Sequence, residues 1–356
     1  MSPFPPTEKD CSGYFCAARY GGIGVNHPSD DVAMNRREFV RRVAAAGSAV
    51  AAAGLGAYWL YDPSPPRRPG GGEESIPRLP DFSVGGAGGK MSIITGPDRK
   101  RSIQRAIQAV GGIGAFIRKG DRVLLKVNAA FATSPLLSAT TNPELLAEVV
   151  RLCLAAGAAS VVVTDNPIND PQSCFELTGI GPAARSAGAR VMLPRESFFR
   201  PISVPDGNLI RNWPILYEPL KGANKVIGIA PLKHHERSGA SMTMKNWYGL
   251  LGGRRNKFHQ DIHNAIKELA MMVRPTLVIL DATTTMMTNG PTGGAMSDLK
   301  QTNTMIVSTD QVAADAFGAT LLGKTAADLP YIAKAAAAGA GTADYESLKP
   351  ARAEAR

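Results

Sequence analysis

The chain has 356 residues, of which 44% are hydrophobic and 20% are charged, a balance typical of a globular protein with one large domain or two modest ones. Its 40 Lys and Arg against 30 Asp and Glu give a formal net charge of +10. This charge favours acidic ligands or anionic surfaces, with solubility alone as the alternative, and because no dense basic run with interleaved aromatic residues occurs, nucleic acid is not an expected partner.

A twin-arginine export signal is predicted near the amino end. Arg36 and Arg37 stand side by side, Phe39 follows, and residues 43–61 are rich in Ala and Gly and carry no charge. A basic segment before a mildly apolar one is typical of a signal sequence. We therefore predict that residues 34–61 direct export by the twin-arginine machinery to the periplasm or cell envelope. An uncleaved membrane anchor is the alternative, and would be the chain's sole contact with a membrane.

The segments on either side of the signal are expected to lie outside the folded domain. Residues 1–33 show no periodicity and Met34 directly precedes the motif, so we predict a disordered extension or a stretch upstream of the true translation start. Residues 62–90 are rich in Pro and Gly and are predicted to be a linker. The domain is then expected over residues 91–345, with residues 346–356 as a frayed tail.

Strand-like and helix-like segments alternate along this domain with short joints between them. This order predicts an α/β fold with a mostly parallel sheet flanked by helices, and leaves open an arrangement in two lobes. The Pro-rich stretch 201–217 is expected to be irregular. Strands are expected at 91–95, 122–127, 160–164, 190–193, 225–230, 277–281 and 305–308. Helices are expected at 101–110, 143–156, 181–187, 260–273, 311–322 and 328–338.

Two of these helices carry clear start signals. Asn142 precedes Pro143 and Glu144, which places a capping side chain, a proline at the first position and an acid in the first turn. Asp310 is likewise expected to cap the helix that follows it.

Polar residues gather just after the predicted strands. Ligands of open α/β sheets bind at the carboxyl edge of the strands, although any one such residue can instead cap a helix or a turn. The polar residues at these positions are Lys126, Asn128, Asp165, Asn166, residues 233–236, Asp281 and Asp310. From these strand ends and the loop described next, the candidate catalytic residues are Lys126, Asn128, Asp165, Lys245, Asn246 and Asp281.

A glycine-rich basic loop follows the first histidine group. Lys245 could hold a phosphate or carboxylate, or act as a base with a depressed pKa. Arg254, Arg255 and Lys257 come directly after several glycines and form the densest basic cluster of the chain. We predict an anion clasp in which Arg254 and Arg255 bind the ligand, with an exposed basic turn as the alternative.

Four histidines of the domain fall within 30 residues, which favours a metal site. His259 and His263 are four residues apart, so on a helix they would share one face, as pairs of metal ligands do. His234 or His235 could supply a third ligand for zinc or iron. The alternative is that His259 lies on the surface and His263 packs in the core.

The cysteines point to no metal centre of their own. Cys11 and Cys16 lie in the leader, whereas Cys153 and Cys174 lie in the domain, and no CxxC pair occurs. A cysteine-ligated iron–sulfur cluster is therefore not expected. A disulfide between Cys153 and Cys174 is left open.

A series of short motifs lies at positions 123–128, 141–144, 156–158, 164–166, 233–234, 245–246, 249, 259, 281, 290–291, 310 and 315. From about residue 92 to 340, the order and spacing of these motifs resemble the bacterial and archaeal family called domain of unknown function 362. Val127 stands where that family usually has proline, so the loop entering Asn128 is expected to differ. Some members carry ferredoxin-like cysteine clusters, which this chain lacks, and the resemblance implies no established reaction.

These patterns support three functions. The first is an exported metal- or cofactor-dependent enzyme, redox enzymes included, because twin-arginine export moves folded cargo. The second is a non-catalytic binding protein for an acidic small molecule, with Lys126, Lys245, Arg254 and Arg255 as the clasp. The third is a structural envelope protein. The first two require that segments 233–236 and 243–263 meet in one cleft at the edge of the sheet.

Overall fold

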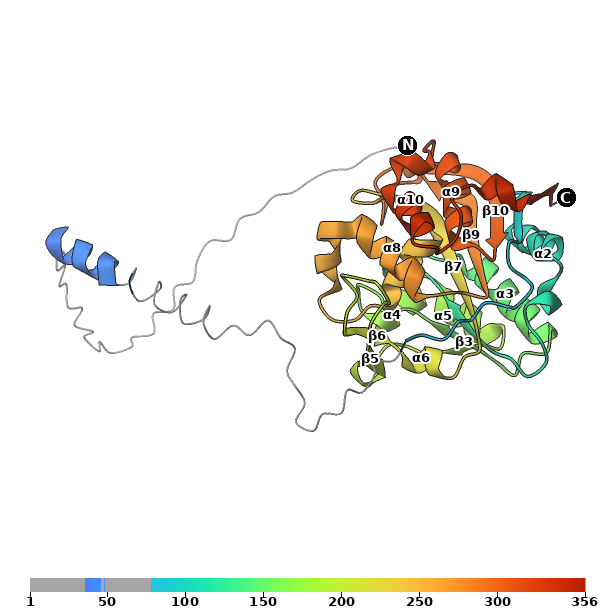
Figure 1. Cartoon of the computed structure of the whole chain (residues 1–356), viewed down its shortest axis with the longest axis horizontal. Coiled ribbons are helices and arrows are strands. Elements are labelled where there is room, and N and C mark those ends of the chain that lie inside the picture. Colours follow the sequence, from blue (N-terminus) through green and yellow to red (C-terminus); the bar gives the residue numbers. More distant parts are fainter. Residues whose placement is uncertain (1–35, 46–47, 49–77, 356) are drawn as a thin grey trace, which may run out of the picture. The chain divides into compact units, whose positions relative to one another are not determined.

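A computed structural model describes residues 36–45, 48 and 78–355 of the chain (Figure 1). Residues 36–45 are helical and exposed, and carry an ion pair of 3.4 Å between Arg42 and Glu38. The arginine pair of the predicted signal lies in this helix, but most of the uncharged segment and all of residues 1–33 lie outside the described residues. Among the helices described, none is long and apolar enough to cross a membrane.

Within residues 78–355, nine strands form one sheet in the order β11-β1-β10-β9-β7-β2-β3-β4, with β8 paired to β7. From β9 to β4 all neighbours are parallel, whereas β10 is antiparallel to both β1 and β9. The predicted α/β fold with a mostly parallel sheet is confirmed. The strands of this sheet are β1 (Met91–Thr95), β2 (Arg122–Lys126), β3 (Ser160–Thr164), β4 (Arg190–Val191), β7 (Lys225–His235), β8 (Gly239–Ser241), β9 (Leu277–Met286), β10 (Leu299–Ser308) and β11 (Ala351–Glu354).

Helices cover both faces of the sheet, because alternate residues of its buried strands point to opposite sides. Leu124 belongs to a core shared with α8, α9 and α10, and Leu125 to a core shared with α2, α3 and α5. The helices are α2 (Arg99–Ala109), α3 (Pro143–Ala155), α4 (Pro171–Leu177), α5 (Ile180–Ser186), α6 (Glu218–Lys221), α7 (Thr243–Asn246), α8 (Ile262–Met272), α9 (Gln311–Leu321) and α10 (Pro330–Ala337).

Both predicted helix caps are confirmed. The Asn142 side chain accepts hydrogen bonds from the main-chain N–H groups of residues 144 and 145 at the start of α3. Asp310 accepts from those of residues 312 and 313 at the start of α9. These bonds satisfy donors that a helix leaves unpaired in its first turn.

Several segments differ from the sequence prediction. The stretch expected to be irregular contains a hairpin of β5 (Phe199–Ile202) and β6 (Trp213–Leu216), and the expected frayed tail forms β11, parallel to β1. Phe82, in the expected linker, is 1% exposed and its carbonyl accepts from Thr276. Residues 78–355 lie within one compact unit, so two lobes are not observed among them.

Candidate functional site

A cavity of about 150 Å³ lies at the carboxyl ends of β2, β3 and β7. Strands β3 and β4 lie on one side of β2, and β7 and β9 lie on the other, so the strand order reverses between β2 and β7. Such a reversal is where open α/β sheets bind ligands. The cavity is lined by Lys126, Asn128, Ala130, Phe131, Asp165, Asn166, Ile168, Lys233, His235, Ser241, Lys245, Asn246, Tyr248, Gly249, Arg255, His259 and Pro291.

Asn246 closes the gap where β2 and β7 stop pairing. Its amide nitrogen donates to the carbonyls of Lys126 and Ile229, each at 3.2 Å. These carbonyls belong to neighbouring strands that diverge at this point, and a buried unpaired carbonyl would cost free energy. Asn246 thus satisfies both strands and fixes the base of the cavity.

Asp315 positions the short helix α7 that carries Lys245 and Asn246. Its carboxyl group is buried and accepts from Thr243 through both the main-chain N–H, at 2.8 Å, and the hydroxyl, at 2.5 Å. It also accepts from the N–H of Met244 at 3.2 Å. Burial raises the pKa of Asp315 to about 7, although these hydrogen bonds lower it.

A buried ion pair holds β2 to β3 at the floor of the cavity. Lys126 Nζ lies 2.8 Å from Asp165 Oδ1, and the two side chains are 1% and 2% exposed. Lys126 also donates to the carbonyl of Val127 at 2.6 Å and to Asn246 Oδ1 at 3.1 Å. An ammonium has three donors, so all those of Lys126 are used within the protein. Burial lowers the pKa of Lys126, and the Asp165 charge opposes this.

Gly249 lets the loop after α7 pass directly over this ion pair. A Cβ atom at position 249 would lie 1.9 Å from Asp165 Oδ1 and 2.7 Å from Lys126 Nζ. The main chain also contributes a carbonyl that accepts from Asn166 N at 2.9 Å. Only glycine therefore fits without displacing a buried charge.

Arg255 holds loops together and leaves little of its guanidinium for a ligand. Its Nη1 donates to the carbonyls of Tyr248 and Leu251, and its Nη2 to those of Asn166 and Pro167. Four of its five donors are thereby occupied. Arg255 still contributes a positive charge at the wall of the cavity.

Lys233 and Lys245 differ from Lys126 because they keep unused donors. Lys233, 2% exposed, donates to the carbonyl of Ala139 and lies over the Phe131 ring, with Nζ 5.2 Å from the centroid. Lys245, 8% exposed, makes no hydrogen bond or ion pair with any described residue, and its Nζ lies 5.0 Å from the Tyr248 centroid. Both ammonium groups are therefore available to a molecule in the cavity.

The pKa values of these two lysines are strongly lowered. Burial, followed by repulsion from Lys245, lowers the pKa of Lys233 to about 7. Burial, followed by repulsion from Arg255, lowers the pKa of Lys245 to about 8. Burial and repulsion both disfavour the charged form of the two lysines. A bound anion would stabilise that form and raise both pKa values.

Two neutral imidazoles complete the polar wall. His235 and His259 stack with ring centroids 6.0 Å apart. Burial and the nearby Lys245 lower the pKa of His235 to about 2, and the same causes lower that of His259. Since His235 Nδ1 accepts from Ser238 N at 3.4 Å, its proton is assigned to Nε2. The Tyr248 hydroxyl donates to the Arg255 carbonyl, so His259 Nδ1 is assigned as the donor to it at 3.1 Å.

Apolar side chains also line the cavity. They include Phe131, Ile168 and Pro291, and Pro291 belongs to a loop held by Asp298. Asp298 accepts from Thr288, from Asn289 and from the N–H groups of residues 294 and 295. The cavity thus offers a ligand both cations and carbon surface.

The structure brings together eight of the twelve predicted site residues and places four elsewhere. Asp281 is paired with Arg99 at 2.8 Å, and Arg254 is exposed outside the cavity. His234 accepts from Gly290 N, and His263 stacks on Tyr331 at 6.0 Å. The eight that line the cavity are Lys126, Asn128, Asp165, His235, Lys245, Asn246, Arg255 and His259.

The predicted three-ligand metal site is not assembled in the described part of the chain. No group of three or more His, Cys, Asp and Glu side chains close enough to hold a metal occurs there. His259 lies in a 3₁₀ turn, Arg255–Asp261, and α8 begins only at Ile262. The two histidines therefore do not share one α-helical face, and His263 points toward α10.

Nine of the 17 lining residues are absent from the list of candidates drawn from the sequence, among them Lys233, Phe131, Tyr248 and Pro291. Lys233 lies in β7, which continues to His235, five residues beyond the predicted strand end. Its strand position beside the histidine group was the available signal. Phe131, Tyr248 and Pro291 carry no chemical pattern in the sequence, because an aromatic or proline wall is recognised only from its neighbours.

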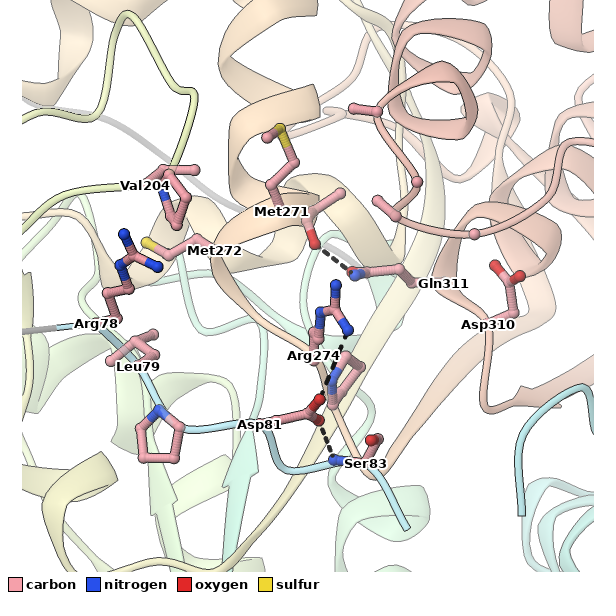
Figure 2. Close-up of a pocket in the computed structure, with 18 of the residues that line it drawn as sticks. Arg78, Leu79, Asp81, Ser83, Val204, Met271, Met272, Arg274, Asp310 and Gln311 are labelled. Carbon is pink, nitrogen blue, oxygen red and sulfur yellow. Dashed lines mark hydrogen bonds and ion pairs between the residues drawn. The ribbon is translucent and has the colours of Figure 1, made fainter. Parts of the chain in front are cut away.

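A larger cavity, of about 540 Å³, lies near the start of the folded unit (Figure 2). Its carboxylates Asp81 and Asp310 have partners within the protein, whereas Arg78 and Asp206 are exposed. Asp81 lies 3.7 Å from Arg274 and accepts from Ser83 N, and Asp310 caps α9 and accepts from Thr342 N. Gln311 donates to the carbonyl of Ala270 at 2.9 Å. This cavity therefore lacks the unpaired buried cations of the smaller one.

Comparison with known proteins places the chain in a family. We call the 150 Å³ cavity the lysine cavity, after Lys126, Lys233 and Lys245. Residues 123–320, which contain every residue that lines it, match the family described as domain of unknown function (DUF362). The chain belongs to this family. DUF362 proteins thus share the region that runs from β2 through α9.

Two individual proteins are similar to this DUF362 protein. A thylakoid-associated protein of Synechocystis sp. is 26% identical over 248 residues, which cover 65% of this chain and 72% of that protein. The solved structure of the lactate racemase apoprotein from Thermoanaerobacterium thermosaccharolyticum matches with a TM-score of 0.34 and 15% identity. That match covers 66% of this chain, which spans about three fifths (59%) of the racemase chain.

Proposed function

We propose that this protein binds a small organic acid in the lysine cavity. The observation that carries the proposal is the pair Lys233 and Lys245, whose ammonium groups are buried yet have unused donors. A buried charge without a partner is unfavourable, and proteins keep such groups where a ligand completes them. A carboxylate or phosphate would supply both the counter-charge and the acceptors.

The charge balance of the cavity supports an anionic ligand. Its cationic side chains are Lys126, Lys233, Lys245 and Arg255, whereas Asp165 is the sole carboxylate among the lining residues. Because Asp165 is already paired with Lys126, it does not neutralise the other three cations. Electrostatic attraction in a site largely shielded from water is stronger than at a surface.

The size and wall of the cavity narrow the ligand class. Its 150 Å³ is below the ~300–1,000 Å³ typical of pockets for drug-sized ligands. A nucleotide is therefore too large, and the apolar side chains of Phe131, Ile168 and Pro291 favour a carbon chain over an inorganic ion. A buried acceptor, Asn128 Oδ1, has no donor in the described protein, so a ligand with a hydroxyl group near its acid would suit it.

Thermal-shift and calorimetric titrations with acetate, lactate, malonate and phosphate test this proposal. We expect at least one acid to raise the melting temperature in a saturable, salt-sensitive manner. Lys245→Met and Lys233→Met should lose the shift, and Lys257→Ala, an exposed lysine of the adjacent loop, should keep it. The proposal fails if no acid stabilises the protein, or if Lys245→Met responds like wild type.

A metal-dependent enzyme is the second candidate. His235 and His259 are neutral and line the same cavity, so a zinc or iron ion could take two ligands from the chain and others from the bound acid. Metal analysis of the purified protein, with and without the acid, tests this candidate. A metal retained by wild type and lost in His259→Ala would favour it, whereas none retained in either condition would remove it.

We propose export by the twin-arginine pathway from Arg36, Arg37 and Phe39 and from the uncharged segment 43–61 that follows them. Fractionation of cells that express the full chain tests it: wild type should reach the envelope fraction, and the variant Arg36→Lys with Arg37→Lys should remain inside. Equal distribution of both proteins would contradict export by this route. The twin-arginine machinery would be the protein partner of this step.

A further inference from the structure

We propose that Lys245 is a nucleophilic amine that forms an imine with a small 2-oxo acid, whose carboxylate is held by Lys233. This inference rests on the acid-binding function proposed above and specifies the ligand class. It assigns different roles to the two lysines that retain free donors.

The surroundings of Lys245 suit a reactive amine. Its side chain is 92% buried (8% exposed), yet neither a carboxylate nor a carbonyl among the described residues binds its Nζ. Lys126 and Asp165 satisfy each other, so no anion is left to hold Lys245 in its charged form. A lysine that is desolvated beside another cation is a recognised type of activated nucleophile.

Lys233 is better suited to hold the carboxylate. Its Nζ is anchored by the carbonyl of Ala139, which an ammonium binds more strongly than a neutral amine does. This leaves two donors for the two oxygens of a carboxylate. The adjacent ring of Phe131 then faces the carbon chain of the acid. In a 2-oxo acid the carbonyl carbon is next to the carboxylate, so one short molecule can reach both lysines.

The imine step is balanced without any other reactant. The Lys245 lone pair attacks the carbonyl carbon, a C–N bond forms, and the carbonyl oxygen takes up a proton to give a carbinolamine. Loss of that oxygen as water, with the second amine hydrogen, leaves the C=N bond. Asn128 Oδ1 can accept from the carbinolamine hydroxyl, and the neutral imidazole of His259 can carry protons between oxygen and nitrogen.

The lowered pKa of Lys245, about 8, agrees with this role. About a tenth of such a lysine is neutral at pH 7, against under about one in a thousand for an ordinary lysine. Lys233 has the still lower pKa of about 7 in the unliganded protein. A carboxylate bound directly to Lys233 would raise that value again and keep its charge.

Reductive trapping tests the proposal. The full-length protein is incubated with pyruvate and sodium cyanoborohydride, and peptide mass spectrometry locates any reduced adduct. We expect one adduct per chain, on Lys245, formed at least tenfold faster than on any exposed lysine. Saturation with pyruvate and competition by lactate would place the reaction in the acid site.

Matched variants separate the roles. Lys245→Arg keeps the charge but cannot form an imine, so it should still bind lactate and give no adduct. Lys233→Arg should still be trapped but need more pyruvate, and Lys257→Ala should behave like wild type. If lactate still binds, an adduct on Lys233 instead of Lys245 would overturn the inference. Labelling of Lys245 no faster than that of exposed lysines would overturn it as well. If lactate, pyruvate and the other acids all fail to bind, the acid-binding function itself is lost.

Discussion

The two ends of the lysine cavity use the same residue type in opposite ways. At the end formed by β2 and β3, Lys126 has an ion pair with Asp165 and two further acceptors. At the end formed by β7 and α7, Lys233 has one acceptor and Lys245 has none within the described residues. The three side chains are 1%, 2% and 8% exposed, so burial does not distinguish them. Counting filled donors does, and it separates a lysine whose donors are all used within the protein from two whose donors are not.

Lys126→Met should produce the largest loss of stability and is the strongest test of this contrast. Removing Lys126 leaves Asp165 charged and buried, which typically costs about 3–5 kcal/mol. Urea unfolding monitored by circular dichroism measures the change in the free energy of unfolding. A loss below about 1 kcal/mol would show that Lys126 is not a structural group, and would contradict the distinction drawn between it and Lys233 and Lys245.

Gly249→Ala should have the next largest effect. The added methyl group would collide with both members of the ion pair, and overpacking of this kind costs about 1–3 kcal/mol. Acid binding should weaken as well, because the loop that carries Gly249 must move away. The matched control is Gly222→Ala, where an added Cβ meets nothing within 4 Å; equal behaviour of the two variants would contradict the steric argument.

The pH dependence of the free energy of unfolding tests whether Lys245, in α7, has a lowered pKa. Lys245 has a folded pKa of about 8 against an ordinary value of 10.5, so between these values the unfolded chain binds more protons. The free energy of unfolding of wild type should therefore rise from pH 8 to 10 relative to that of Lys245→Met. Acid binding should weaken over the same range, as the cation is lost. Parallel stability curves for the two proteins would exclude a lowered pKa at Lys245.

Lys245→Met should have the smallest effect on stability, although it should abolish acid binding. The variant removes a buried cation without a partner and replaces it with an apolar chain of similar length, so we expect a change within about 1 kcal/mol, in the stabilising direction. Denaturant midpoints at pH 7 measure it. Destabilisation by several kcal/mol would mean that Lys245 has a structural role.

The fold was largely predictable because its local signals agree with one another. Asn142, Pro143 and Glu144 mark a helix start, and short apolar runs mark β2, β3 and the first half of β7. The strands that the sequence did not predict are those that form only by pairing with a strand elsewhere in the chain. The hairpin β5–β6 lies in a Pro-rich stretch, and β11 exists because the edge of β1, more than 250 residues away, accepts it.

The site was predictable in its location but not in its internal pairing. The rule that polar residues follow parallel strands correctly grouped Lys126, Asn128 and Asp165. It wrongly included Asp281, because β9 continues for five residues beyond Asp281, the predicted strand end, and Arg99 of α2 pairs with this carboxylate. The four-residue spacing of His259 and His263 did not place them on one helical face, because His259 lies in a 3₁₀ turn and only His263 lies in α8. Which lysine keeps free donors depends on carbonyls such as that of Ala139, which no pattern in the sequence reveals.

The strand β11 has a practical consequence for handling the protein. Residues 92–95 of β1 pair with residues 351–354 of β11. The strand β11 therefore covers an edge of β1 that would otherwise be exposed. A truncation at Leu348 would expose that row of main-chain amides and carbonyls to solvent and to other molecules. Such a truncated protein should self-associate during purification. An affinity tag placed after Arg356 should leave the pairing of β1 and β11 intact.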